Sequence, residues 1–202
     1  MKFTQTILFL TAGVLTSSLP LHSQVKTAAA SPWSELKQVV GLTEFSVKYS
    51  RPSAKERDIY GELVPYDKVW RTGANATTKI AFDTEIKFGG KLIPAGEYVL
   101  FSIPGVVEWT VILYGDTKVA NAGLYDPTND VARITAKPLT LANPVESFTI
   151  GFDALRDTSA TLFIDWATIR VPIEIEMDTV ALPLASINSA MRSIDSLTAL
   201  DF

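Results

Sequence analysis

The sequence predicts an all-β protein: an antiparallel β-sandwich, or a flattened barrel, with a short N-terminal helix and a C-terminal amphipathic helix. Short segments in which apolar and polar residues alternate recur along most of the 202-residue chain, as expected of strands with one buried face. Turn signals containing Gly and Pro separate these segments at close spacing, and almost no helical pattern lies between them. Short connections of this kind favour antiparallel pairing, which is typical of sandwiches and barrels.

Residues 1–23 have the layout of a secretory signal peptide. Lys2 provides a charged start, and Phe3–Leu15 is an apolar run that is too short to span a bilayer. We expect cleavage after Ser23 and export to the periplasm or the cell exterior. An uncleaved N-terminal anchor is the alternative. Residues 24–30 read as a linker of mainly small residues.

The composition excludes several classes of protein. The chain has no Cys and a single His, His22, which lies in the predicted leader. The mature chain would therefore lack Ser–His–Asp and Cys–His catalytic sites and His/Cys zinc sites, and we expect no cofactor and no metal. Loss of Lys2 changes the net charge from −4 to −5, which gives no electrostatic reason to bind nucleic acid. No later apolar run is long enough for a transmembrane segment.

A short helix is predicted directly after the linker. Ser31 is a favoured N-cap residue and Pro32 suits the first helical position. Trp33, Leu36 and Val40 would then fall near one face, and Gly41 would end the helix.

The remaining predicted elements up to residue 177 are strands. Two of them, 98–103 and 109–114, are apolar at nearly every position, so we expect central strands that are covered on both faces. Gly89-Gly90 predicts a hairpin, and residues 69–71 could add a short edge strand. The other predicted strands are 45–50, 78–82, 86–88, 131–137, 147–152, 162–166 and 169–175.

The sandwich domain is predicted to span residues 31–177 and to be followed by a tail, residues 178–202. Apolar residues in this tail recur at helical spacing, which predicts one amphipathic helix. They are Leu184, Ile187, Met191, Ile194 and Leu197. The stripe covers too few heptads for a coiled coil, so docking on the sandwich or fraying is favoured over self-association or partner binding.

The densest cluster of cations and aromatic residues lies in the segment Ser50–Asn75. Arginine forks bind carboxylate or phosphate in two-pronged fashion, and Tyr and Asn could add contacts to an anionic or sugar-like ligand. The candidate ligand-binding residues are Arg51, Lys55, Arg57, Tyr60, Trp70, Arg71 and Asn75. The competing interpretation, which the frequency of ion pairs in sandwiches favours, is that Arg51 and Arg71 pair with carboxylates of neighbouring strands.

Two weaker patterns involve carboxylates. Oxygen-bearing side chains in a tight turn could hold calcium, but this turn does not match the EF-hand pattern and reads as an ordinary turn. Its candidate ligands are Asp126, Thr128, Asn129 and Asp130. Asp153 with Asp157, or either of them with Asp165, could perform acid–base chemistry on a glycoside, although loop carboxylates are usually only solvated.

Four Trp residues could provide a platform for a sugar. Trp109 and Trp166 sit inside strand patterns and are predicted to be core residues, whereas Trp70 remains a candidate. Asn75-Ala76-Thr77 also matches a glycosylation acceptor, which only a eukaryotic secretory host would use routinely.

Three blocks of sequence resemble a known family. They are GLTEFSVKYSRPSAKERDIYGELVPYDKVWRTGAN, GGKLIPAGEYVLFSIPG and EWTVIL. They resemble the bacterial family known as domain of unknown function 2911, and the resemblance covers about residues 31–176. It implies an exported, β-rich protein and no particular mechanism. Members often carry a Trp-rich segment where this chain has VANAGLYDP, so the aromatic surface that such a segment supplies is not expected to carry over.

The sequence does not reveal a definite activity. We expect a non-catalytic module of the cell envelope that binds an anionic or sugar-like ligand or an envelope protein. One alternative is an enzyme acting on carbohydrate or another envelope substrate through Asp/Glu or Lys/Tyr chemistry, since His and Cys are absent. The other is a structural module that assembles through its C-terminal helix.

Overall fold

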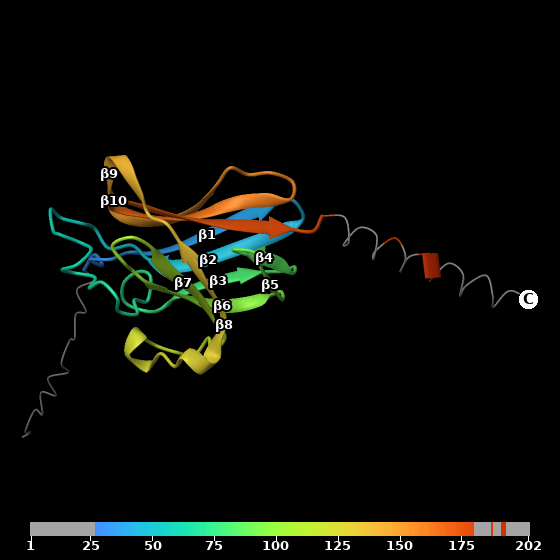
Figure 1. Ribbon diagram of the computed structural model, residues 1–202, viewed down its shortest axis with the longest axis horizontal. Helices are drawn as coiled ribbons and strands as arrows, with labels where there is room; N and C mark the ends of the chain where they lie inside the picture. Colours follow the sequence, from blue (N-terminus) through green and yellow to red (C-terminus); the bar gives the residue numbers. More distant parts are fainter. Residues whose placement is uncertain (1–26, 180–186, 188–190, 193–202) are drawn as a thin grey trace, which may run out of the picture.

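Two antiparallel sheets pack face to face in the computed structural model, which describes residues 27–179, 187, 191 and 192 (Figure 1). The first sheet has six strands in the order β1-β2-β3-β6-β7-β8 and the second has four in the order β5-β4-β10-β9. The strands are β1 (Trp33–Val40), β2 (Thr43–Ser50), β3 (Thr78–Phe82), β4 (Ile86–Phe88), β5 (Lys91–Ile93), β6 (Gly96–Ile103), β7 (Trp109–Tyr114), β8 (Asp130–Ala136), β9 (Leu139–Asp153) and β10 (Ser159–Met177). The prediction of an all-β sandwich is thus confirmed.

The core lies between the sheets and follows the alternation in the sequence. Phe45 of β2 meets Phe152 of β9 at 5.1 Å between ring centroids, and Tyr49 of β2 meets Phe148 of β9 at 5.8 Å. Because successive side chains of a strand point to opposite faces, their polar neighbours face outward. Burial of this apolar face is the main source of stability in a domain without disulfides.

The prediction of an N-terminal helix is wrong, because residues 33–40 form strand β1. All eight residues of β1 pair with β2, from Trp33 opposite Ser50 to Val40 opposite Thr43. Gly41, with a φ of +58°, makes the tight turn between the two strands, where a residue with a Cβ would be strained. A full ladder outweighs the local cap signal of Ser31-Pro32, since tertiary context overrides helix propensity.

Strands β6 and β7 are central and covered on both faces, as predicted. On the outer face of the six-stranded sheet, a second apolar cluster is centred on Phe101, Ile112 and Tyr114. The segment between β7 and β8 lies against this face and contains two short 3₁₀ helices, η1 (Ala122–Leu124) and η2 (Pro127–Asn129) (Figure 1). The predicted edge strand at residues 69–71 is only a single bridge, between Trp70 and Ser102.

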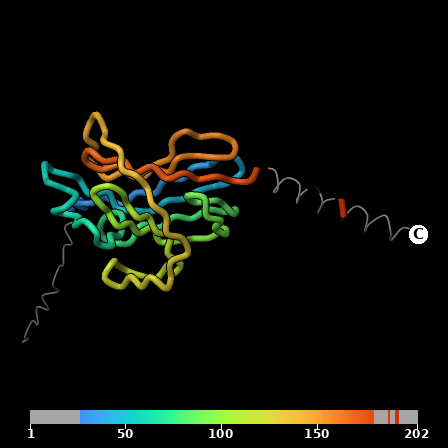
Figure 2. Tube along the Cα trace, viewed as in Figure 1, coloured from blue at the N-terminus to red at the C-terminus, as the bar shows by residue number. Residues whose placement is uncertain are grey.

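Strand β10 joins the two predicted strands 162–166 and 169–175 into one strand that folds back on itself. A straight strand of 19 residues would span roughly 60 Å. Instead, the Met177 amide donates to the Thr158 carbonyl at 2.8 Å, so the two ends meet, and the trace runs out and back (Figure 2). The bend has register shifts near Ala167, whose φ is +50°.

Parts of the domain prediction fall on residues outside the described ranges. These are the predicted leader, 1–23, and most of the predicted C-terminal helix, of which only Ile187, Met191 and Arg192 are described. No continuous α-helix occurs in the described part of the chain. Within the same residues, no helix has the length and apolar character to cross a membrane.

Candidate functional site

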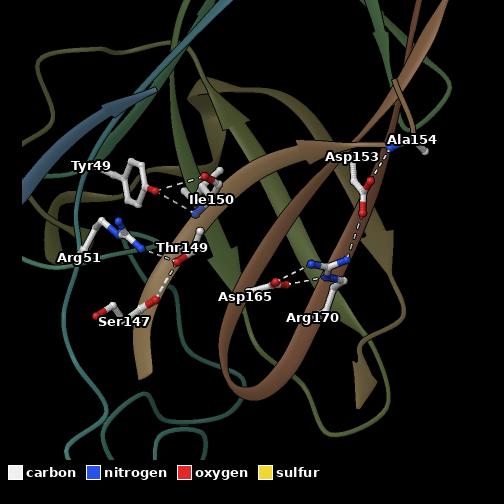
Figure 3. A network of polar contacts seen from close by, with 9 residues as sticks. All are labelled: Tyr49, Arg51, Ser147, Thr149, Ile150, Asp153, Ala154, Asp165 and Arg170. Atoms are coloured by element: carbon white, nitrogen blue, oxygen red, sulfur yellow. Dashed lines mark hydrogen bonds and ion pairs between the residues drawn. The ribbon is translucent and has the colours of Figure 1, made fainter. Parts of the chain in front are cut away.

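Arg51 fastens the end of β2 to β9. Its Nε donates to the Phe148 carbonyl at 2.9 Å. Its Nη2 donates to the Thr149 hydroxyl at 2.7 Å (Figure 3). The neighbouring Tyr49 hydroxyl makes two more bonds, to the carbonyl and from the amide of Ile150. The Arg51 guanidinium is therefore held by β9, through a backbone carbonyl and a hydroxyl rather than through the carboxylate partner that the sequence suggested.

The other cations of the predicted ligand site do not converge with Arg51 on one shared pocket. Arg57 donates to the carbonyls of Ala54 and Ser53, at 2.9 and 2.6 Å, and so braces its own loop. Within the part of the chain that the structure describes, neither the Lys55 ammonium nor the Arg71 guanidinium forms a hydrogen bond or an ion pair.

Asn75 lies apart from these cations and donates its side-chain amide to the Ser31 carbonyl at 3.2 Å. Of the seven predicted site residues, only Arg57 and Tyr60 line one shared cavity.

Four aromatic side chains pack together beside this cavity. The Tyr60 ring meets Trp109 edge to face at 5.0 Å between centroids and Trp70 at 6.4 Å, and Trp70 stacks on Trp166 at 6.0 Å. Trp109 and Trp166 are buried, as predicted from their place in the strand patterns. Trp70 also packs against the core and donates its Nε1 to the Gly73 carbonyl, so it offers no open platform. Of these four rings only Tyr60 lines the cavity, and the three Trp rings pack against it from the core.

The cavity has a volume of about 760 Å³, within the range of small-molecule sites. Three segments far apart in the sequence surround it: the loop at residues 54–66, residues 144–146 of β9, and residues 167–169 in the bend of β10. Ile59, Val145 and Ile169 give it apolar walls, and Tyr60 and Tyr66 add aromatic surface.

The charges around the cavity are mostly negative. Arg57 is the one cation among the lining residues. Four carboxylates also line the cavity, from Glu56, Asp58, Glu62 and Glu146. A small anion would be repelled here, whereas an ammonium group or a set of hydroxyl donors would find acceptors. The lining of this cavity is thus acidic, whereas the sequence pattern suggested a cationic pocket in this segment.

The backbone around the cavity is strained. Lys55, Glu56 and Ala167 have φ values of +50°, +57° and +50°, a region that residues with a Cβ adopt at a cost. The Glu146 carboxylate accepts the Lys55 amide at 3.0 Å, and the Glu146 carbonyl accepts the Ala54 amide at 2.7 Å. Strain held by such bonds is typical of functional sites.

The Tyr60 hydroxyl is the one buried side-chain polar atom without a hydrogen-bond partner among the described residues. Burial raises the pKa of Tyr60 far above its usual value, and the charge of Asp165 raises this pKa further. The phenol therefore stays neutral across the physiological range. An unpartnered buried hydroxyl costs stability.

Tyr60→Phe is expected to raise the free energy of unfolding by about 1 kcal/mol, because it removes an unpaired buried hydroxyl. Folding raises the pKa of Tyr60. The pH-dependent part of the free energy of unfolding that comes from this phenol is therefore complete below about pH 10 and is lost as the pH rises above that value. The variant should lose less stability between pH 9 and pH 11 in urea unfolding. Destabilisation at pH 7 would show that the hydroxyl has a partner.

The predicted carboxylate pair does not form an acid–base site. Asp165 is buried and accepts two bonds from Arg170, at 2.8 and 2.7 Å, and Asp153 accepts a third at 3.4 Å (Figure 3). The Arg170 guanidinium also lies 4.2 Å from the Phe163 ring centroid. Asp157 is exposed and lies outside this network. The carboxylates are therefore joined through one arginine rather than facing each other across a cleft.

The turn at residues 126–130 uses its oxygens internally. Asp126 accepts the Thr128 amide at 3.0 Å, which lowers the pKa of Asp126. Asp130 accepts bonds from the Tyr125 hydroxyl and from Arg133. No group of three or more potential ligands for a metal ion occurs in the described residues.

Sequence reasoning missed the acidic character of the site. The run ERDIYGE places Glu56, Asp58 and Glu62 within seven residues, so this part of the acidic lining could have been read from the sequence. Glu146 lies far along the chain and reaches the cavity only because Ser53 bridges to Ser147 of β9. Sequence position alone gives no sign of this contact.

Together, fold and site define an antiparallel β-sandwich with an acidic, partly aromatic cavity at the bend of one sheet. A family model described as "Protein of unknown function (DUF2911)" matches residues 31–175, which is most of the chain. The chain therefore belongs to this family, and the resemblance predicted from its motifs is confirmed. No curated protein and no solved structure was found to match it.

Proposed function

We propose that this protein is a non-catalytic binding module whose cavity takes a small ligand with a cationic amine and several hydroxyl groups, as in an amino sugar. The observation that carries this proposal is the set of four carboxylates around an apolar and tyrosine-lined cavity. Carboxylates accept hydrogen bonds from ammonium and hydroxyl groups, and the aromatic walls can cover the apolar face of a ring.

The arrangement of the carboxylates supports binding over catalysis. Asp165 is engaged in a two-pronged pair with Arg170, and the chain has no Cys and no His beyond residue 22. Acid–base chemistry on a glycoside needs two carboxyl groups that flank the reacting bond, and the network around Arg170 does not have this form. We place the binding activity outside the cytoplasm, on the strength of the predicted leader.

Glucosamine should bind more tightly than N-acetylglucosamine, which keeps the ring but lacks the positive charge. Isothermal titration of the full chain measures both affinities. The double variant Glu62→Gln/Glu146→Gln should weaken glucosamine binding about tenfold, because two partly exposed ion pairs are lost. The amide that replaces the Glu146 carboxylate retains an oxygen that can accept the Lys55 amide, so the fold should be preserved.

Glu44→Gln is the matched control. Glu44 is exposed, pairs with Lys37 at 3.5 Å and lies outside the cavity lining. This variant should bind glucosamine as the unmodified chain does. Equal binding of the two sugars, or an unchanged affinity in the double variant, would refute the proposal.

A further inference from the structure

A second hollow lies on the outer face of the six-stranded sheet and has the opposite charge. It has a volume of about 360 Å³ and is lined by Lys48, Lys79 and Lys118, with no carboxylate among its lining residues. The segment 117–120 forms one side, where the Thr77 hydroxyl donates to the Val119 carbonyl at 3.0 Å. The hollow thus lies beside the segment that covers the outer face of β6 and β7.

Two of these lysines are placed at a cost to stability. Lys48 of β2 and Lys79 of β3 lie directly opposite each other in the ladder, so their side chains share one face. Like charges in such a pair repel. Glu35 lies 4.0 Å from the Lys48 ammonium and Glu97 lies 3.0 Å from that of Lys79, and both pairs are partly exposed.

The ammonium group of the third lysine has no such carboxylate partner among the described residues. Lys118 bonds to Asp116 through its backbone amide, and its ammonium forms no hydrogen bond or ion pair within the described part of the chain. The ammonium groups of Lys48 and Lys79 thus each have a carboxylate partner, whereas that of Lys118 has none among the described residues. An anion that enters the hollow would relieve the repulsion between Lys48 and Lys79 and would pair with Lys118.

Trp33 gives the hollow an aromatic side. It is 64% exposed, although the other three Trp residues pack into the core. Its partner in the ladder is Ser50, and Lys48 lies two residues before Ser50 on the same face of β2. An exposed indole offers a flat apolar surface on which a sugar ring can lie while its charged group meets the lysines.

We propose that this hollow binds an anionic sugar, with Trp33 under the ring and Lys48, Lys79 and Lys118 around the charged group. The site is separate from the acidic cavity and shares no lining residue with it. The two sites select ligands of opposite charge, so each proposal can fail without the other.

The test is isothermal titration of the full chain with glucose 6-phosphate, inorganic phosphate and glucose. Glucose 6-phosphate should bind most tightly, inorganic phosphate more weakly, and glucose should give no measurable heat. Lys48→Gln and Lys118→Gln should each weaken glucose 6-phosphate binding about fivefold. Trp33→Ala should weaken glucose 6-phosphate binding to a similar degree and leave phosphate binding unchanged.

Lys37→Gln is the matched control, since Lys37 lies on the same face of β1 as Trp33, pairs with Glu44 and does not line the hollow. It should change the affinity less than about twofold. Lys48→Gln should not lower the urea midpoint, because it removes a like-charge pair. Equal effects of Lys37→Gln and Lys118→Gln on glucose 6-phosphate binding would overturn the proposal. It would also be overturned if inorganic phosphate bound as tightly as glucose 6-phosphate, or if glucose bound as tightly as either of these anions.

Discussion

Trp166→Ala is expected to lower the free energy of unfolding by about 3–5 kcal/mol, the largest effect that we predict for a single substitution. Trp166 is 1% exposed, and its ring packs against Trp70 and Phe148, with centroids 6.0 and 5.8 Å apart. Its Nε1 donates to the Glu146 carbonyl at 3.2 Å, so the same side chain supports the β9 wall of the cavity. Urea unfolding followed by circular dichroism measures the loss.

Trp33→Ala serves as the control for this experiment, because Trp33 is 64% exposed and forms no ring contact with the other aromatic residues that the structure describes. Its free energy of unfolding should change by no more than about 0.5 kcal/mol. If Trp166→Ala cost as little as Trp33→Ala, the aromatic cluster behind Tyr60 would not be tightly packed.

Arg170→Met is expected to cost about 3 kcal/mol of stability, since it leaves a buried carboxylate without its partner. The Asp165 side chain is 6% exposed and receives two bonds from Arg170, whose own side chain is 29% exposed. This pair bridges the bend of β10, so its loss should also loosen the wall formed by residues 167–169. The unfolding midpoint in urea reports the first effect, and hydrogen exchange of the Ala167–Ile169 amides reports the second.

The double variant Asp165→Leu/Arg170→Met should recover much of this loss, because an apolar pair leaves no charge buried. Lys87→Met is the matched control, since Lys87 pairs with Glu176 at 3.3 Å and both side chains are 53% exposed. It should change stability by no more than about 0.5 kcal/mol. A loss in Arg170→Met that the double variant fails to reduce would mean that Arg170 acts through its contact with Phe163 instead.

The fold was largely predictable because strand alternation is a local signal. β2 and β3 appear where period-two patterns place them, and β7 appears where a nearly continuous apolar run predicts a central strand. The error at β1 has a physical cause: Ser31-Pro32 is a valid local helix start, but the ladder with β2 is a tertiary interaction that the local pattern does not contain. The fold-back of β10 depends on a bulge at Ala167, and no residue type there signals it.

The site was less predictable because it depends on contacts between distant segments. Arg51 and Arg57 looked available for a ligand, yet each finds acceptors on the chain, some 97 residues away for Arg51 and only 3 or 4 away for Arg57. Ion-pair partners cannot be assigned until the strand order is known. Tyr60 lines a cavity whose charged residues are mostly carboxylates, whereas the Arg and Lys residues of the segment suggested a cationic pocket.

Chemical-shift mapping of the full chain with glucosamine tests the central claim most directly, because it shows both whether the ligand binds and where. We predict that shifts cluster at residues 56–62, at Val145 and Glu146, and at Thr168 and Ile169, around the acidic cavity. Shifts centred instead on Arg71 and Asn75, or none at millimolar glucosamine, would contradict the claim that this cavity is the ligand site.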